Sequence, residues 1–230
     1  MQQLPPPPDV PERPPPRLLA GEQPLSLRTQ DGLQLEALAR LPARATRAVV
    51  FCHPHPLYGG TMHNAVILTL ARRVAEVSAD DTATLRFNFR GVEGSEGTHD
   101  QGRGELLDAI AAVDHVKHAL PRARITLVGY SFGSWVGLRA AWRDPDIERY
   151  ALIAPAVRLL DYEAYASEWR PIHAEIAVGD HDQFVEVTDA RRLAERIGAT
   201  LHVIDGADHF FVAHRSLLAR TLMSFIVPAV

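Results

Sequence analysis

The residues of this sequence best suited to nucleophilic chemistry surround Ser131. This serine is the centre of Gly129-Tyr-Ser-Phe-Gly133, which follows the aliphatic run 125–128 and precedes a stretch with helical spacing at 135–142. The context predicts a strand, a sharp turn and a helix, with the serine at the turn. Glycines suit both flanks because strand and helix approach too closely for side chains. The N–H of Phe132 and the N-terminus of the new helix would then lie beside a developing oxyanion.

A base and an acid follow Ser131 in the order Asp, then His, each in a loop after a predicted strand. His209 would remove the serine proton and return it to the leaving group, while Asp182 orients the imidazole and stabilises its cation. Asp180 is an alternative acid, but its place directly after the strand favours a turn-shaping role. Asp208, next to the base, also fits a turn former better than the acid.

The composition favours one large domain and excludes several kinds of partner. With 230 residues, of which 47% are hydrophobic, the chain can bury one sizeable core. A net charge of −4 gives no electrostatic case for nucleic acid. Cys52 is the only cysteine, so neither an intrachain disulfide nor a cysteine-based metal site is expected. No apolar run is long enough for a membrane span and no secretory signal is recognisable, so a cytoplasmic location without membrane association is expected.

The chain divides into a tail and a domain. Residues 1–24 contain two proline runs, 5–8 and 14–16, which favour polyproline II or disorder and cannot join a sheet interior. The folded domain is therefore predicted over 25–230.

Strands and helices alternate along the predicted domain, which indicates parallel β-α-β units and an α/β fold. In open sheets of this kind, binding and catalytic sites lie beyond the carboxyl ends of the strands. The predicted strands are 33–41 (antiparallel, near one edge), 48–52, 83–88, 125–128, 150–154, 173–178 and 200–204, and the predicted helices are 62–77, 105–119, 135–142, 187–197 and 211–226.

Two further loops complete a resemblance. The segments Phe51-Cys-His-Pro-His-Pro-Leu-Tyr-Gly-Gly-Thr-Met-His-Asn64 and Phe87-Asn-Phe-Arg-Gly-Val-Glu-Gly-Ser-Glu-Gly97, with the Ser131 motif, resemble the small bacterial α/β-hydrolases predicted to be serine hydrolases. The similarity covers residue 25 to the end and implies an α/β-hydrolase fold, a mostly parallel sheet with helices on both faces and no large lid. It also favours Asp182, because Gly179-x-x-Asp182 matches the family's acid loop. Glu93 departs from the pattern, since the family often has glycine there.

The loop 53–60 follows the strand that neighbours the serine turn and should supply the second oxyanion N–H. Its prolines cannot donate, which leaves His55 or Leu57, with Tyr58 less suitable; superfamily placement favours His55. The imidazoles of His53 and His55 are expected to bond neighbouring loops. In the adjacent loop, Arg90, Gly91 and Ser95 are expected to brace the structure.

The substrate is less defined by the sequence. About eighteen residues separate Ala154 from His173, too few for a large lid, so the pocket is expected to be shallow and open. The histidines show no paired metal-ligand spacing, so neither a metal nor another cofactor is expected. Candidate substrate contacts are the aromatic side chains of Tyr58, Tyr130 and Tyr162, with Tyr165 and Trp169 in the same connector as Tyr162. Packing against the sheet is an equally good alternative for the connector residues.

Three functions fit these residues. The first is hydrolysis of a small carboxylic ester or thioester through an acyl-enzyme. The second is acyl transfer, condensation or cyclisation by the same residues, and the third is a non-catalytic binding protein on the same fold. The sequence leaves acyl length and oligomeric state open.

Overall fold

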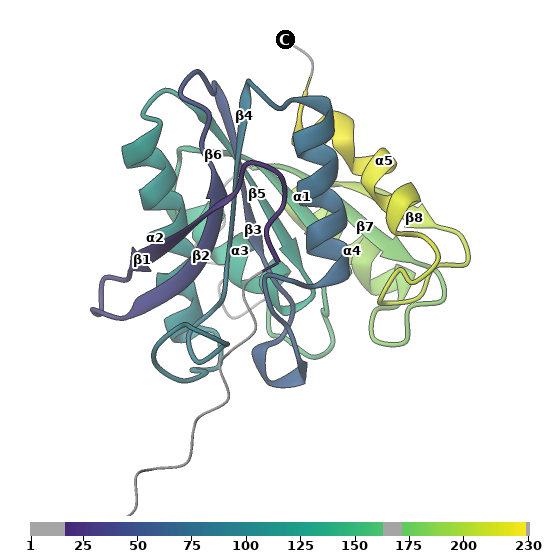
Figure 1. Ribbon diagram of the computed structural model, residues 1–230. Coiled ribbons are helices and arrows are strands. Elements are labelled where there is room, and N and C mark those ends of the chain that lie inside the picture. Colours follow the sequence, from purple (N-terminus) through teal and green to yellow (C-terminus); the bar gives the residue numbers. More distant parts are fainter. Residues whose placement is uncertain (1–16, 163–171, 229–230) are drawn as a thin grey trace, which may run out of the picture.

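The computed structural model describes residues 17–162 and 172–228. Within these residues the chain folds around a sheet of eight strands (Figure 1). The strands of this described part are β1 (Gln23–Arg28), β2 (Gln34–Arg40), β3 (Arg47–Cys52), β4 (Thr82–Phe87), β5 (Arg124–Tyr130), β6 (Ile147–Ile153), β7 (His173–Gly179) and β8 (Thr200–Ile204). The helices are α1 (Ala65–Val77), α2 (Arg103–Ala119), α3 (Phe132–Arg143), α4 (Val187–Ile197) and α5 (Arg215–Ile226), and a short 3₁₀ turn, η1, spans Pro56–Tyr58.

The strand order across the sheet is β1-β2-β4-β3-β5-β6-β7-β8. The strands from β4 to β8 in this order run parallel, whereas β2 pairs antiparallel with both β1 and β4. β5 lies in the middle, with Gly129 paired to Cys52 on β3 and to Leu152 on β6. The carboxyl ends of the parallel strands therefore meet at one edge, as the sequence predicts.

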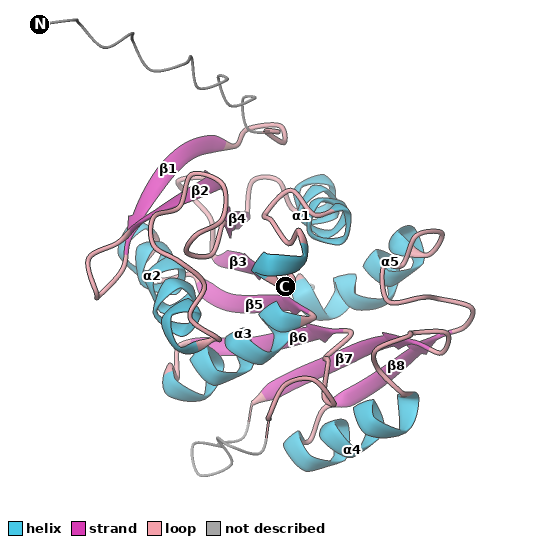
Figure 2. Ribbon diagram, turned by 90° about the horizontal axis from the view of Figure 1, so that it is seen from below, coloured by secondary structure: helices cyan, strands magenta, loops and turns pink. Residues whose placement is uncertain are grey.

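Helices cover both faces of the sheet (Figure 2). α1 and α5 pack against each other on one face, and α2 and α3 pack against each other on the opposite face. α4 contacts β7 and β8 on the same face as α3. The predicted α/β class, with a mostly parallel sheet and helices on both faces, is confirmed. The connection from β6 to β7 occupies only residues 154–172, so no large lid domain is inserted there.

Two helices begin later than the sequence predicts, each for a local reason. α1 begins at Ala65 rather than at residue 62, because the side-chain oxygen of Asn64 accepts the Val66 N–H at 2.9 Å and caps the helix. α5 begins at Arg215 rather than at residue 211, because Phe211 has a φ of 48°, which is outside the right-handed helical region.

The predicted domain boundary at residue 24 falls inside β1, a strand that the sequence analysis does not predict. Just before this strand, the Glu22 carboxylate is buried against Arg86 on β4, with Nε–Oε1 and NH2–Oε2 distances of 2.8 and 2.6 Å. The same guanidinium donates to the carbonyl of Arg17 at 2.5 Å. Residues 17–24 therefore belong to the folded domain, and the remaining tail, 1–16, lies outside the described residues.

Within the described ranges, no helix combines the length and the apolar character that crossing a bilayer requires.

Candidate active site

Ser131 lies between β5 and α3 with a strained backbone, φ 53° and ψ −114°. The turn is tight on both sides. A Cβ at Gly133 would collide with the backbone oxygen of Cys52, and one at Gly129 would collide with the hydroxyl of Tyr150 and the carbonyl of residue 133. Only glycine fits at either position. The expected closeness of strand and helix explains Gly129, whereas Gly133 is constrained by the backbone of the neighbouring strand β3.

The structure brings Ser131, His209 and Asp182 into one hydrogen-bonded chain. The serine Oγ lies 3.2 Å from His209 Nε2, and His209 Nδ1 lies 2.8 Å from Asp182 Oδ2. The aspartate side chain is fully buried and that of the histidine is 7% exposed. With its proton on Nδ1, the imidazole donates to the carboxylate and can accept the serine proton at Nε2.

The environment of Asp182 distinguishes it from the neighbouring aspartates. While Oδ2 faces His209, Oδ1 accepts the N–H groups of Phe184 and Val185 at 2.8 and 2.9 Å. Asp180 instead accepts the Gly206 N–H at 2.7 Å. Three hydrogen bonds to one buried carboxylate fix its orientation toward the imidazole.

Asp208 accepts the N–H of Val212 at 3.1 Å, so its carboxylate shapes the turn that carries His209. Like Asp180, it takes the turn-forming place that the sequence favours for it.

Tyr130, a candidate substrate contact, supports the base loop. Its side chain is 1% exposed, and its hydroxyl donates to the carbonyl of His209 at 2.8 Å. Burial raises the pKa of this phenol, so the hydroxyl keeps its proton and remains a donor. Because the hydroxyl is engaged and enclosed, Tyr130 holds the backbone of His209 and is not part of an open pocket.

Phe132 is the first residue of α3, so its N–H has no carbonyl partner within the helix and is free to serve an oxyanion. The loop 53–60 packs beside it, with the ring of His55 4.8 Å from that of Phe132. The N–H of Leu57 is engaged, since it donates to Nδ1 of His55 at 3.2 Å. This contact weakens Leu57 as the second oxyanion donor and leaves the backbone of His55 as the better candidate.

The side chain of His53 joins two loops behind the site. Its Nε2 accepts the Phe89 N–H at 3.0 Å and its Nδ1 lies 2.6 Å from the carbonyl of Pro54. Complete burial lowers the pKa of His53 to about 3, so the ring stays neutral and can accept at Nε2. The expectation that both imidazoles bond neighbouring loops is confirmed for His53, which accepts from Phe89, whereas the ring of His55 accepts the N–H of Leu57 within its own loop.

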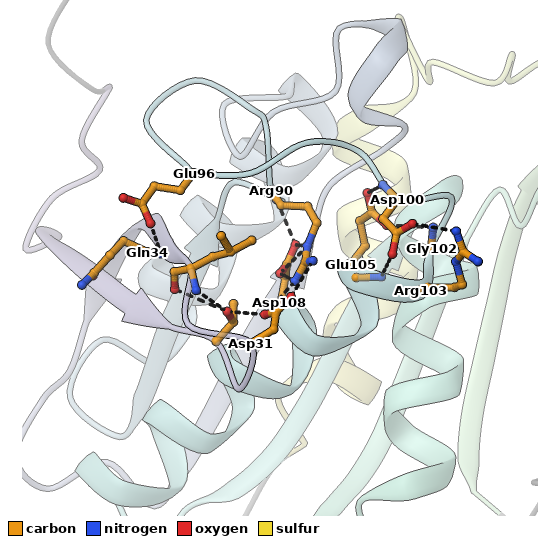
Figure 3. Close-up of polar contacts among 12 residues, drawn as sticks. Asp31, Gln34, Arg90, Glu96, Asp100, Gly102, Arg103, Glu105 and Asp108 are labelled. Carbon is orange, nitrogen blue, oxygen red and sulfur yellow. Dashed lines mark hydrogen bonds and ion pairs between the residues drawn. The ribbon is translucent and has the colours of Figure 1, made fainter.

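Arg90 is a bracing residue, as expected, and points between two carboxylates in Figure 3. Its guanidinium donates to buried Asp108 at 2.7 Å and to Asp31 at 2.9 Å, which joins the loop after β4 to α2 and to the β1–β2 turn. The hydroxyl of Ser95 bridges the carbonyl of Asn88 and the N–H of residue 36, so it braces the same loop.

Glu93 adopts a φ of 49°, a conformation that favours glycine, and its carboxylate accepts from Asn88 at 2.7 Å. The family's usual glycine at this position is consistent with that backbone.

Two remaining substrate candidates lie in different settings. Tyr58 is 86% exposed on η1. Tyr162 is buried, with its hydroxyl 2.9 Å from the hydroxyl of Ser134 in the first turn of α3, so it packs behind the serine turn. Tyr165 and Trp169 lie outside the described residues.

Two aromatic side chains near the base escape the sequence analysis. Phe184 and Phe210 lie with their ring centroids 4.9 and 5.5 Å from that of His209. Their only sequence signal is their position within the acid and base loops.

Over residues 17–162 and 172–228, no group of three or more His, Cys, Asp or Glu side chains is arranged to hold a metal ion.

Residues 47–176 match the family model of the alpha/beta hydrolase fold, and the chain belongs to this family. A solved structure from Xanthomonas campestris, described as an α/β serine hydrolase without a lid, is 28% identical, covering 94% of this chain and 100% of that chain, with a TM-score of 0.77. An α/β serine hydrolase homologue from Coxiella burnetii is 32% identical over 90% of this chain and 100% of its own, with a TM-score of 0.76.

An uncharacterized protein of Rickettsia prowazekii (strain Madrid E) is 33% identical over 184 residues, 76% of each chain. The resemblance inferred from the sequence is therefore confirmed at the level of family and fold. Membership in this family supports a hydrolase.

Proposed function

We propose that this protein is a serine hydrolase that cleaves a carboxylic ester or thioester through an acyl-enzyme. The observation that carries the proposal is the continuous contact from Ser131 Oγ through His209 to buried Asp182, at 3.2 and 2.8 Å. This arrangement matches the nucleophile, base and orienting acid of acyl-transfer enzymes.

In the first half-reaction, Ser131 Oγ attacks the carbonyl carbon while His209 Nε2 takes the hydroxyl proton. The carbonyl oxygen becomes an oxyanion facing the N–H of Phe132 and, in our proposal, that of His55. Collapse breaks the bond between the carbonyl carbon and the leaving oxygen or sulfur, which receives the proton from His209.

In the second half-reaction, His209 takes a proton from water as the water oxygen attacks the acyl carbon. The bond to Ser131 Oγ breaks, the proton passes to that oxygen, and the carboxylic acid leaves. The short connection between β6 and β7 favours hydrolysis over transfer to another acceptor, because no lid domain excludes water.

The test combines labelling with turnover. A fluorophosphonate probe should label the wild type and not Ser131→Ala, and this variant should hydrolyse p-nitrophenyl acetate at least about 10³-fold more slowly. Ser216→Ala, an exposed serine on α5, is the matched control and should keep both properties. If Ser131→Ala hydrolysed the ester as fast as the wild type, the proposal would be lost.

Acyl transfer is tested by adding competing alcohols or amines to the reaction. A hydrolase forms mainly the free acid, whereas predominant transfer product would overturn hydrolysis as the reaction.

A further inference from the structure

Two half-exposed phenylalanines lie next to the proposed base. Phe184 and Phe210 stand at interplanar angles of 75° and 90° to the His209 imidazole, and their own centroids are 6.4 Å apart. They are 45% and 51% exposed, although the side chain of His209 beside them is almost enclosed. Exposed aromatic surface from two different loops therefore lies in contact with this imidazole.

Both rings are attached to rigid backbone. The N–H of Phe184 donates to the buried carboxylate of Asp182 at 2.8 Å. Phe210 directly follows His209, whose carbonyl accepts from buried Tyr130 at 2.8 Å. Exposed aromatic rings on fixed backbone next to reactive groups are typical of ligand contacts, because ligand burial removes apolar surface from water at little cost in loop ordering.

The proposed chemistry indicates which part of a substrate these rings meet. His209 must deliver its proton to the leaving atom, so that atom has to come within hydrogen-bond reach of Nε2. The carbonyl oxygen faces the other way, toward the N–H of Phe132. A substituent on the leaving atom therefore extends along the imidazole, and the two phenylalanines are exposed rings in contact with that imidazole.

We infer that Phe184 and Phe210 form a binding surface for the alcohol or thiol part of the substrate and select apolar, above all aromatic, leaving groups. This inference rests on the proposed function. Edge-to-face stacking on two rings held nearly perpendicular to each other gives an aromatic leaving group more contact than a methyl group can make.

The test uses esters that share the acetyl group and differ in the alcohol. The ratio of kcat/KM for benzyl acetate to that for methyl acetate should fall about tenfold in Phe184→Ala and in Phe210→Ala, the effect of losing one aromatic contact each. Leucine at either position should restore part of the ratio. Val212→Ala removes an exposed apolar side chain two residues beyond Phe210 and should leave the ratio as in the wild type.

Three outcomes would overturn the inference. One is an unchanged benzyl-to-methyl ratio in both alanine variants. Another is a change confined to a p-nitrophenyl series of increasing acyl length, which would place the rings on the acyl side. The third is loss of fluorophosphonate labelling at Ser131 together with loss of both esters, which would mean that the rings only hold His209. Failure of the proposed function is separate, since it would show in the wild type and Ser131→Ala.

Discussion

Replacing Asp182 by asparagine tests the arrangement most directly, because the structure allows the result to be worked out. In the native carboxylate, Oδ1 accepts two backbone N–H groups, from Phe184 and Val185, and Oδ2 accepts from His209. Asparagine offers one oxygen and one NH2 group in place of two acceptors. One side of the residue must therefore face a group with which it cannot bond.

The two orientations of this asparagine differ in free energy. If its NH2 group faced the two backbone donors, two N–H groups would lose the carboxylate oxygen that accepts them, at about 1–3 kcal/mol each. The orientation with the NH2 group toward His209 is therefore favoured by about 2–6 kcal/mol. The imidazole must then accept at Nδ1 and carry its proton on Nε2, where it cannot take the proton of Ser131. Adding the lost stabilisation of the imidazolium, we expect kcat/KM to fall about 10³- to 10⁴-fold.

The assay is hydrolysis of p-nitrophenyl acetate, with urea unfolding to confirm that the variant is folded. Asp180→Asn and Asp208→Asn are matched controls, because each carboxylate accepts a single backbone N–H and an amide oxygen can replace it. Both should retain kcat/KM within about threefold. The reasoning is refuted if Asp182→Asn loses less than about tenfold, or if either control loses more than Asp182→Asn does.

Three further variants test the support around the site. Tyr130→Phe removes the donor to the His209 carbonyl and should lower the free energy of unfolding by about 1–2 kcal/mol in urea. Gly133→Ala presses a methyl group against the carbonyl of Cys52 and should reduce fluorophosphonate labelling more than about 100-fold. Because the pKa of His53 is lowered to about 3, its neutral imidazole leaves the folded state fully stable above pH 6.5. Between pH 6.5 and pH 3, the free energy of unfolding should fall by up to about 5 kcal/mol, and by less in His53→Gln.

Each of these expectations has a contradicting result. Wild-type stability in Tyr130→Phe would mean that another donor serves the carbonyl. Normal labelling of Gly133→Ala would mean that the turn can relax around a methyl group. For His53 the unfolded imidazole binds a proton below pH 6.5 that the folded imidazole does not bind, so an equal fall of the unfolding free energy in the wild type and in His53→Gln would contradict the expectation. His118→Gln, a substitution at an exposed histidine on α2, is the control that should keep the wild-type slope.

Much of the fold could be predicted because its signals are local. Gly129, Ser131 and Gly133 stand in one short strand-turn-helix segment of the sequence, and a short aliphatic run predicts a buried parallel strand on either side of it. The order of Ser131, Asp182 and His209 then places three loops at one sheet edge, since parallel strands end together.

The remainder depends on contacts between distant segments. β1 was missed because its place depends on pairing with β2 and on the contact of Glu22 with a strand more than sixty residues away. The role of Tyr130 was missed because an almost wholly apolar strand does not reveal which face its last residue occupies. The proximity of Phe184 and Phe210 follows from two loops meeting across β7 and β8.

The ion pair between Glu22 and Arg86 sets the smallest version of this protein that can fold independently. A chain starting at residue 25 would lack both Glu22 and the carbonyl of Arg17, which are the counter-charge and one acceptor of a guanidinium that is buried in the intact domain. Leaving a buried cation without its counter-charge costs about 3–5 kcal/mol, a large part of the roughly 5–15 kcal/mol that keeps a domain folded. Truncation should therefore stop at or before residue 17.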